Sequence, residues 1–286
     1  MPQNEEQITP EEAVLSIVQR SGTSFYWAMR ILPPQKRDAM FAIYAFCREV
    51  DDIADGAEKP ETKLSKLQNW RDEIDALYKG APNHLVTRAL AKPLDAYQLT
   101  KEDFIAVIDG METDATDQLR LQNMGALVLY CDQVACAVGR LSNAVFGLDR
   151  SKSIELAKYL GEALQLTNIL RDVEEDAERN HVYLPKDVLT THAIASEAVN
   201  DILEHPGLEQ VCAELAERAR QDYQQAQSII ATCDENLIRP AIIMMKIYHR
   251  LFILLERRGW QRLDIPIKVS KAWKLWLAAR ILIFKS

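Results

Sequence analysis

Two groups of oxygen-bearing side chains recur at intervals of four residues along the chain. They are Asp51 and Asp55 in one stretch, and Asn168, Asp172 and Asp176 in the other. Residues four apart project from the same face of a helix, where like charges repel unless a cation lies between them. Mg²⁺ suits such a place, because it binds one or two carboxylates together with phosphate oxygens and water. Two such arrays facing each other across a cavity would hold Mg²⁺ ions, which would bind a diphosphate and withdraw charge as it leaves.

The alternative interpretation is that each cluster is only the solvated acidic end of a helix. One Asp-x-x-x-Asp pattern alone favours that alternative. Both clusters, however, end an apolar helix and carry an arginine on the neighbouring turn, Arg48 in the first and Arg171 in the second. This repetition favours a functional site. A deep apolar space between the helices would then hold a hydrocarbon chain and keep water from a carbocation.

The elements that must position these side chains are predicted to be helices. The 286 residues include only 10 glycines and 11 prolines, fewer breakers than sheet-rich proteins place at their turns. Apolar residues at helical spacing predict helices over 11–20, 35–53, 63–78, 84–95, 101–112, 119–146, 153–175, 208–231 and 237–257. No alternating run requires a strand, and no stretch rich in Pro, Gly or Ser marks a boundary. We therefore expect one all-α domain over residues 1–266, with long helices around a central cavity.

The charges divide unevenly between this domain and the end of the chain. Residues 257–286 hold eight basic residues and one acidic residue, whereas residues 1–256 hold 26 basic and 41 acidic. A net charge of −8 argues against a nucleic-acid binder. The five cysteines form no C-x-x-C pair, which fits a reducing compartment. The N-terminus lacks the features of a signal peptide, and no uncharged apolar run is long enough to span a membrane. A cytoplasmic protein is expected.

Residues 267–286 are expected to form a basic helix that contains tryptophan. Trp273, Trp276, Leu277, Ile281 and Phe284 alternate there with Lys271, Lys274 and Arg280. This composition suits a helix that lies on an anionic membrane, at the inner face of the cytoplasmic membrane. The alternative is a helix that packs back on the domain core.

Longer motifs resemble those of the head-to-head prenyl synthases, the squalene/phytoene synthase family. They lie at residues 24–26, 42–55, 130–139, 165–176 and 183–185. The amino-acid sequences at residues 24–30, 110–115 and 139–142 are most similar to those of the bacterial hopanoid-pathway branch, which makes presqualene diphosphate. The resemblance implies an isoprenoid-synthase-type helical bundle, two farnesyl diphosphates as substrates and Mg²⁺ as cofactor.

The resemblance also implies roles for individual residues. The metal ligands would be Asp51, Asp55, Asn168, Asp172 and Asp176. Arg48 and Arg171 would steady diphosphate oxygens, for which a planar, always-charged fork is suited. Tyr130 matches a tyrosine that assists cation stabilisation or proton removal. Substrate-binding positions would be Ser24, Tyr44, Gln165, Tyr183 and Tyr248.

The chain departs from the family pattern at two places. Relatives often carry a basic residue where this chain has Ser21. A C-terminal arginine of some relatives aligns with Ile265, so Arg262 or Lys268 is a candidate for that role.

Several other polar residues receive no role. Asp114 and Asp117 are interpreted as a solvated turn, and Asp52 and Glu175 as acids that point away from the metal. Cys131 and Cys136 are interpreted as small core residues, and the five histidines form no ligand spacing.

Other activities stay open from the sequence. Squalene synthase would need NADPH, whereas dehydrosqualene and phytoene synthases would not. A head-to-tail chain elongator or a cyclase also uses aspartate-rich helices, but the Asn168 cluster and the Tyr130 stretch argue against both. A non-catalytic helical protein that binds a membrane surface is the alternative outside enzymes. Whether the substrate has a C15 or a C20 chain depends on the depth of the cavity.

Overall fold

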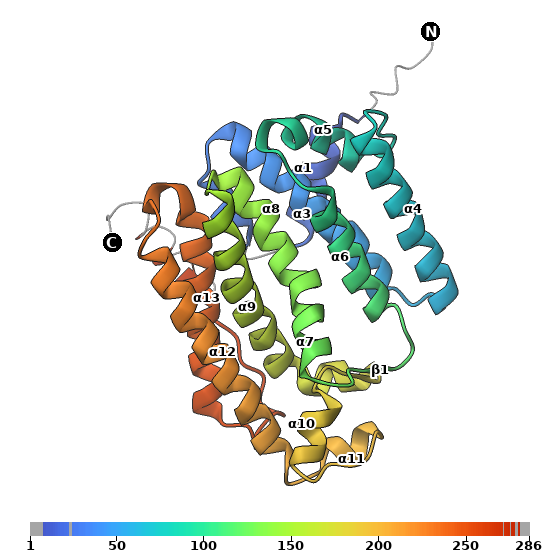
Figure 1. The fold of residues 1–286 in the computed structure, drawn as a ribbon, viewed down its shortest axis with the longest axis vertical. Helices are drawn as coiled ribbons and strands as arrows, with labels where there is room; N and C mark the ends of the chain where they lie inside the picture. The colour runs from blue at the N-terminus through green and yellow to red at the C-terminus, as the bar shows by residue number, and fades with distance from the viewer. Residues whose placement is uncertain (1–7, 23–24, 271, 275, 278–279, 281–286) are drawn as a thin grey trace.

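The computed structural model describes residues 8–22, 25–270, 272–274, 276–277 and 280. Long helices run side by side along the molecule and shorter ones close its ends (Figure 1). The first half of the chain forms α1 (Pro10–Arg20), α2 (Phe25–Arg30), α3 (Pro34–Asp55), α4 (Pro60–Tyr78), α5 (Leu85–Tyr97) and α6 (Lys101–Asp114). The middle forms β1 (Leu119–Arg120), α7 (Met124–Cys131), the π-helical turn η1 (Asp132–Cys136), α8 (Ala137–Phe146) and α9 (Arg150–Glu178). The rest forms β2 (His181–Val182), α10 (Lys186–Thr191), α11 (Val199–Leu203), α12 (Leu208–Ile230) and α13 (Glu235–Arg258).

The all-α expectation is confirmed, and each of the nine predicted helices has a counterpart. The prediction of a continuous helix over 119–146 is wrong at its start. Leu119 and Arg120 pair in parallel with His181 and Val182, and α7 begins only after Asn123, whose Oδ1 accepts from Ala126 N at 3.0 Å. Strands of two residues are too short for an alternating pattern, and for that reason the sequence does not show them. The short helices α2, α10 and α11 were also not predicted.

The π-helical turn η1 is packed closely on both sides. A Cβ at Gly110 of α6 would lie 2.4 Å from Val134 Cγ1, and one at Gly161 of α9 would lie 2.9 Å from Cys136 Sγ. Only glycine lets the helices approach this closely. Turns of this kind occur often at functional sites, and η1 begins two residues after Tyr130, which lies in the last turn of α7.

The stretch Met124–Phe146 is, within the described residues, the one helix long and apolar enough to cross a membrane. The central helix of a globular core meets the same criterion, and this stretch lies between α6 and α9 (Figure 1). It also carries two charges, which are paired. Arg140 binds Asp132 at 2.7 Å and Asp103 of α6 at 2.5 Å. Packing against α6 and α9 accounts for part of this apolar composition, and 33% of the apolar window is buried.

A single apolar cluster extends through the described residues from Val14 in α1 to Leu277 near the C-terminus. Phe46 of α3 lies at its centre, with ring centroids 5.1 Å from Phe104 and 5.6 Å from Trp70. Cys131 and Cys136 are buried, as expected for small core residues. Leu277 is buried and Trp273 packs against the cluster, whereas Trp276 is 53% exposed. Core packing therefore includes Trp273 and Leu277, and the division of the chain at 266/267 stays a prediction.

Candidate active site

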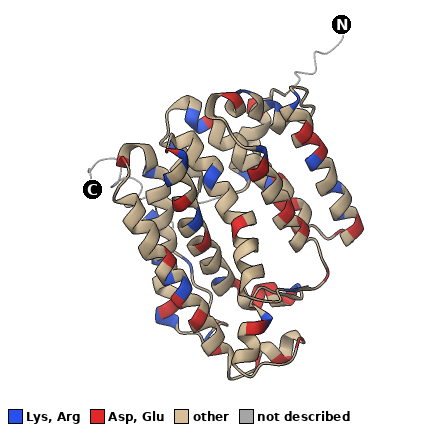
Figure 2. Cartoon of the chain, in the orientation of Figure 1, with Lys and Arg blue, Asp and Glu red and all other residues tan. Residues whose placement is uncertain are grey.

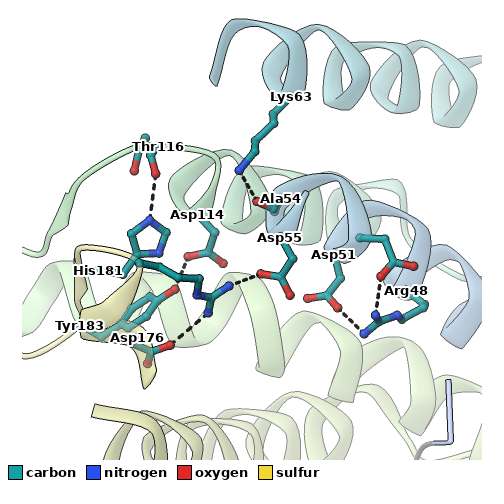
Figure 3. A network of polar contacts seen from close by, with 12 residues as sticks. Arg48, Asp51, Ala54, Asp55, Lys63, Asp114, Thr116, Asp176, His181 and Tyr183 are labelled. Carbon is teal, nitrogen blue, oxygen red and sulfur yellow. Dashed lines mark hydrogen bonds and ion pairs between the residues drawn. The ribbon is translucent and has the colours of Figure 1, made fainter. Parts of the chain in front are cut away.

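The first acidic array lies at the C-terminal end of α3. Arg48 Nη1 binds Asp51 Oδ2 at 2.9 Å, and its other terminal nitrogen pairs with Asp52. Lys63 of α4 donates to the Ala54 carbonyl at 2.7 Å, so one of the terminal carbonyls of α3 has a partner. Asp51 and Asp55 lie on one face of the helix, as the four-residue spacing predicts (Figure 3).

The second acidic array lies on the last two turns of α9. Arg171 forms two bonds to its neighbour Asp172, at 2.6 Å from Nε and 2.5 Å from Nη2. The side chain of Asp176 is only 13% exposed. Asn168, one turn before Asp172, keeps its Oδ1 buried and without a hydrogen-bond partner among the described residues. Arg48 and Arg171 therefore both pair with acids here, and their contact with a diphosphate stays a prediction.

One arginine joins the two arrays. Arg179 directly follows α9, and its Nη1 lies 2.5 Å from Asp55 Oδ1 while its Nη2 lies 3.2 Å from Asp176 Oδ1. This guanidinium therefore lies between Asp55 of α3 and Asp176 of α9, both of which are labelled in Figure 3. The sequence alone gives Arg179 no predicted role. Its position three residues after Asp176 was the only local signal, because Asp55 is 124 residues away.

A second polar group adjoins the acidic arrays. Tyr130 Oη donates to Asp114 Oδ2 at 2.9 Å, and Tyr183 Oη donates to Asp114 Oδ1 at 2.7 Å. The two rings are stacked at a tilt, with centroids 4.9 Å apart. The interpretation of Asp114 as a solvated turn is wrong, because it is the last residue of α6 and its part-buried carboxylate accepts from both tyrosines. Asp117, three residues later, is exposed as expected.

Aromatic residues line the other side of the site. Phe25 lies between Tyr44 of α3 and Tyr248 of α13, with ring centroids 6.3 Å and 6.5 Å away. Burial raises the pKa of Tyr248, although the neighbouring Arg171 and Asn168 of α9 lower it. Gln165 Oε1 accepts from Asn168 Nδ2 at 3.4 Å. The structure thus brings together every proposed site residue except Ser24, which lies outside the described residues.

The carboxylates of the site are crowded enough to hold protons near neutral pH. Burial, followed by the charge of Asp55, raises the pKa of Asp51 to about 6, although Arg48 opposes the shift. Burial and Asp172 raise the pKa of Asp176 to about 7 against the pull of Arg179. Negative charge is therefore in excess here, which favours the binding of a cation.

These residues fit Mg²⁺. Within the described residues, no three His, Cys, Asp or Glu side chains converge on one point. Mg²⁺ does not require such a cage, since it keeps several waters and binds through one or two carboxylates plus phosphate oxygens. Each array offers a pair of carboxylates, and the unpartnered Asn168 Oδ1 adds a neutral oxygen. The donor chemistry matches the expected cofactor.

A groove of about 1010 Å³ opens beside the second array, between α9, α13 and the segment after α13. Arg171, Asp172 and Tyr248 line one side and Lys268 the other. Arg262 instead pairs loosely with Asp264 at 3.4 Å and is 61% exposed. Of the two candidates for the C-terminal basic residue, Lys268 is therefore the one at the site. Ser21 donates its hydroxyl to the Val18 carbonyl at 2.8 Å and caps α1.

Positions of acidic and basic residues are interspersed along the helices in Figure 2.

Comparison with known proteins agrees with this geometry. The profile of the squalene/phytoene synthase family matches residues 18–273. A presqualene diphosphate synthase from Sinorhizobium fredii is 44% identical over 253 residues, which are 88% of this chain and 90% of the relative. Another, from Rhodopseudomonas palustris, is 43% identical over 267 residues, 93% of this chain and 95% of the relative. A solved dehydrosqualene synthase in complex with ligand has a TM-score of 0.82 at 27% identity, and the match covers 96% of this chain and 95% of that one. The chain belongs to the squalene/phytoene synthase family.

Proposed function

We propose that the protein is a prenyltransferase that condenses two farnesyl diphosphates head to head into presqualene diphosphate, with release of diphosphate, in hopanoid and squalene biosynthesis. The observation that carries the proposal is the pair of acidic arrays on α3 and α9, which Arg179 joins beside the Tyr130–Asp114–Tyr183 group. The similarity to two presqualene diphosphate synthases supports the choice of product.

Different residues of the chain bind the diphosphate groups and stabilise the hydrocarbon cation. Arg48 and Arg171 bind diphosphate oxygens, exchanging part of their present contacts with Asp51 and Asp172 for the substrate. The donor ionises to an allylic cation, and the double bond of the acceptor attacks its first carbon. A proton is then lost and a cyclopropane ring closes. The ring face of Tyr130 stabilises the cation, as aromatic faces do.

Aromatic and aliphatic side chains exclude water from the cation. Tyr44, Phe25 and Tyr248 form a partly buried wall, and Gln165 and Asn168 orient the polar end of the site. Asp51, Asp55, Asn168, Asp172 and Asp176 would hold Mg²⁺. When bound, the ions supply positive charge that balances the departing diphosphate.

The test uses purified protein with radiolabelled farnesyl diphosphate and Mg²⁺, with and without NADPH. Presqualene diphosphate should accumulate equally in both reactions. A neutral hydrocarbon would instead identify a squalene synthase if NADPH is required, or a dehydrosqualene synthase if it is not. Turnover of geranylgeranyl diphosphate alone would indicate a phytoene synthase. The absence of turnover with either substrate would contradict the enzyme and favour a helical membrane-surface protein.

We also propose that the segment after α13 contacts an anionic membrane at the inner face of the cytoplasmic membrane. Trp276 is 53% exposed, and Arg280 lies 5.4 Å from the centre of its ring. Trp273 and Leu277 face the core, so the segment presents one tryptophan and basic residues outward. An oily product would leave the enzyme there. Lys271, Ile281 and Phe284 lie outside the described residues.

A further inference from the structure

Asp114 is a carboxylate with two tyrosine partners and no cation. Its oxygens accept from Tyr130 at 2.9 Å and from Tyr183 at 2.7 Å, and the two tyrosines are only 4% and 7% exposed. Among the described residues, no Lys, Arg or His side chain forms an ion pair with it. Asp51 and Asp55, whose charges are negative, act on it from α3.

A carboxylate in such a place is costly to the fold. Removing a charge from water is repaid only by a counter-charge or by full hydrogen bonding, and two neutral hydroxyls supply only part of that. Burial therefore raises the pKa of Asp114 to about 7, although both tyrosine hydrogen bonds lower it. An asparagine or an apolar residue would fill the position at less cost if its role were only to tie α6 to its neighbours. A group that changes its protonation near neutral pH is suited to receive a proton.

Tyr130 alone cannot accept the proton that is lost as the cyclopropane ring closes. Burial and the neighbouring Asp114 charge raise the pKa of its hydroxyl well above the usual range, so Tyr130 remains a neutral phenol. A neutral phenol takes up a proton only if it gives one away at the same time. The hydroxyl already points its own proton at Asp114 Oδ2.

On the basis of the proposed function, we propose that Asp114 is a positioning residue that orients the Tyr130 hydroxyl and takes up, through it, the proton released as the cyclopropane closes. The C–H bond at the donor's first carbon breaks, and its electron pair forms the second ring bond to the cationic carbon of the acceptor. The proton passes to Tyr130 Oη while the hydroxyl proton of Tyr130 passes to Asp114 Oδ2. Tyr130 ends neutral and Asp114 ends as a carboxylic acid. Tyr183 fixes the other oxygen, so the carboxylate cannot rotate.

The experiment compares wild type with Asp114→Asn, and uses Asp117→Asn as the matched control because Asp117 is exposed and three residues away. Diphosphate release and presqualene diphosphate formation are measured separately, with unlabelled substrate and with farnesyl diphosphate deuterated at its first carbon. In Asp114→Asn, product formation should fall on the order of 10²-fold, as for the loss of a proton acceptor. Diphosphate release should fall less, KM should change little, and a primary deuterium isotope effect should emerge.

A merely structural role gives a different result. It would lower both rates together, without a change in isotope effect, and equal rates in wild type and Asp114→Asn would also overturn the proposal. If Asp114→Asn does not fold, Asp114→Glu carries the test. It keeps the carboxylate but displaces it by one methylene, so the isotope effect should again exceed that of wild type. If the wild type itself makes no presqualene diphosphate, the proposed function fails, and that outcome is visible before any variant is compared.

Discussion

Arg179 Nη1 lies 2.5 Å from Asp55 Oδ1, so the residue that follows α9 is bound to the last residue of α3. With its second contact to Asp176, this guanidinium stands where two carboxylate arrays approach each other. Its charge partly neutralises both arrays. Asp51 pairs with Arg48 instead, and Asp172 pairs with Arg171.

Replacing Arg179 should show how much its positive charge stabilises the two carboxylate arrays. Arg179→Gln leaves Asp55 and Asp176 without their shared cation and should lower the free energy of unfolding by about 1 kcal/mol, as for half-exposed ion pairs. Added Mg²⁺ should raise the melting temperature of this variant more than that of wild type. Thermal melts with EDTA or MgCl₂ measure both effects. Arg37→Gln, which removes a surface pair with Asp38, is the control and should respond to Mg²⁺ as wild type does.

The second acidic array should control the requirement for metal. Asp176→Asn removes a carboxylate that is 13% exposed and should raise the Mg²⁺ concentration needed for half-maximal diphosphate release by about tenfold or more. EDTA should abolish release by the wild type. Glu175→Gln is the matched control, since this adjacent acid is exposed. Equal Mg²⁺ curves for the two variants would exclude Asp176 as a ligand.

A buried acid outside the site should make stability depend on pH. Asp222 of α12 is 7% exposed and faces Glu162 of α9, which pairs with Arg218. Burial and Glu162 raise the pKa of Asp222 from 3.8 to about 7, although Arg218 and Lys158 oppose the shift. A raised pKa means that the folded protein binds this proton more tightly than the unfolded chain. The stability that Asp222 contributes is therefore complete below pH 3.8 and is lost as the pH rises to about 7.

The corresponding measurement is denaturant unfolding of wild type and Asp222→Asn at pH 5 and pH 8. Asparagine keeps a neutral amide at both pH values. Relative to wild type, the variant should gain about 1–3 kcal/mol on going from pH 5 to pH 8, given about 1.4 kcal/mol for each unit of pKa difference. A constant difference between the two proteins would show that Asp222 titrates normally.

Membrane contact should depend on the exposed tryptophan. Trp276→Ala should weaken sedimentation with vesicles that contain an anionic lipid, and salt should weaken wild-type binding, because basic residues accompany the tryptophan. Ile154→Ala, at an apolar side chain that is 47% exposed on α9, is the control and should bind as wild type does. Equal binding of both variants would mean that the segment serves only to pack on the core.

The sequence predicted those features that depend on one helix at a time. Asp51 and Asp55 share a face because of the helical period, and the same holds for Asn168, Asp172 and Asp176. Asp114 and Arg179 were missed because Asp114 contacts Tyr130 and Tyr183, and Arg179 contacts Asp55, which belong to other elements. Tyr130 is 16 residues from Asp114 and Tyr183 is 69 residues away, so no local spacing announces the group. The acidic end of α6 has the same sequence whether its last residue, Asp114, faces water or two tyrosines.

Both acidic arrays occupy the last turns of their helices, and neither α3 nor α9 has a basic residue in its own last turn. The unsatisfied carbonyls of a helix end already give it a partial negative charge, and carboxylates placed there oppose the macrodipole. The carboxylates of the site are therefore electrostatically unfavourable by themselves. A bound cation removes this repulsion, and it stabilises the folded protein more the more tightly it binds. Resistance to heat in this protein should consequently report how fully the site is loaded, so melting curves can rank substrate analogues before any product is detected.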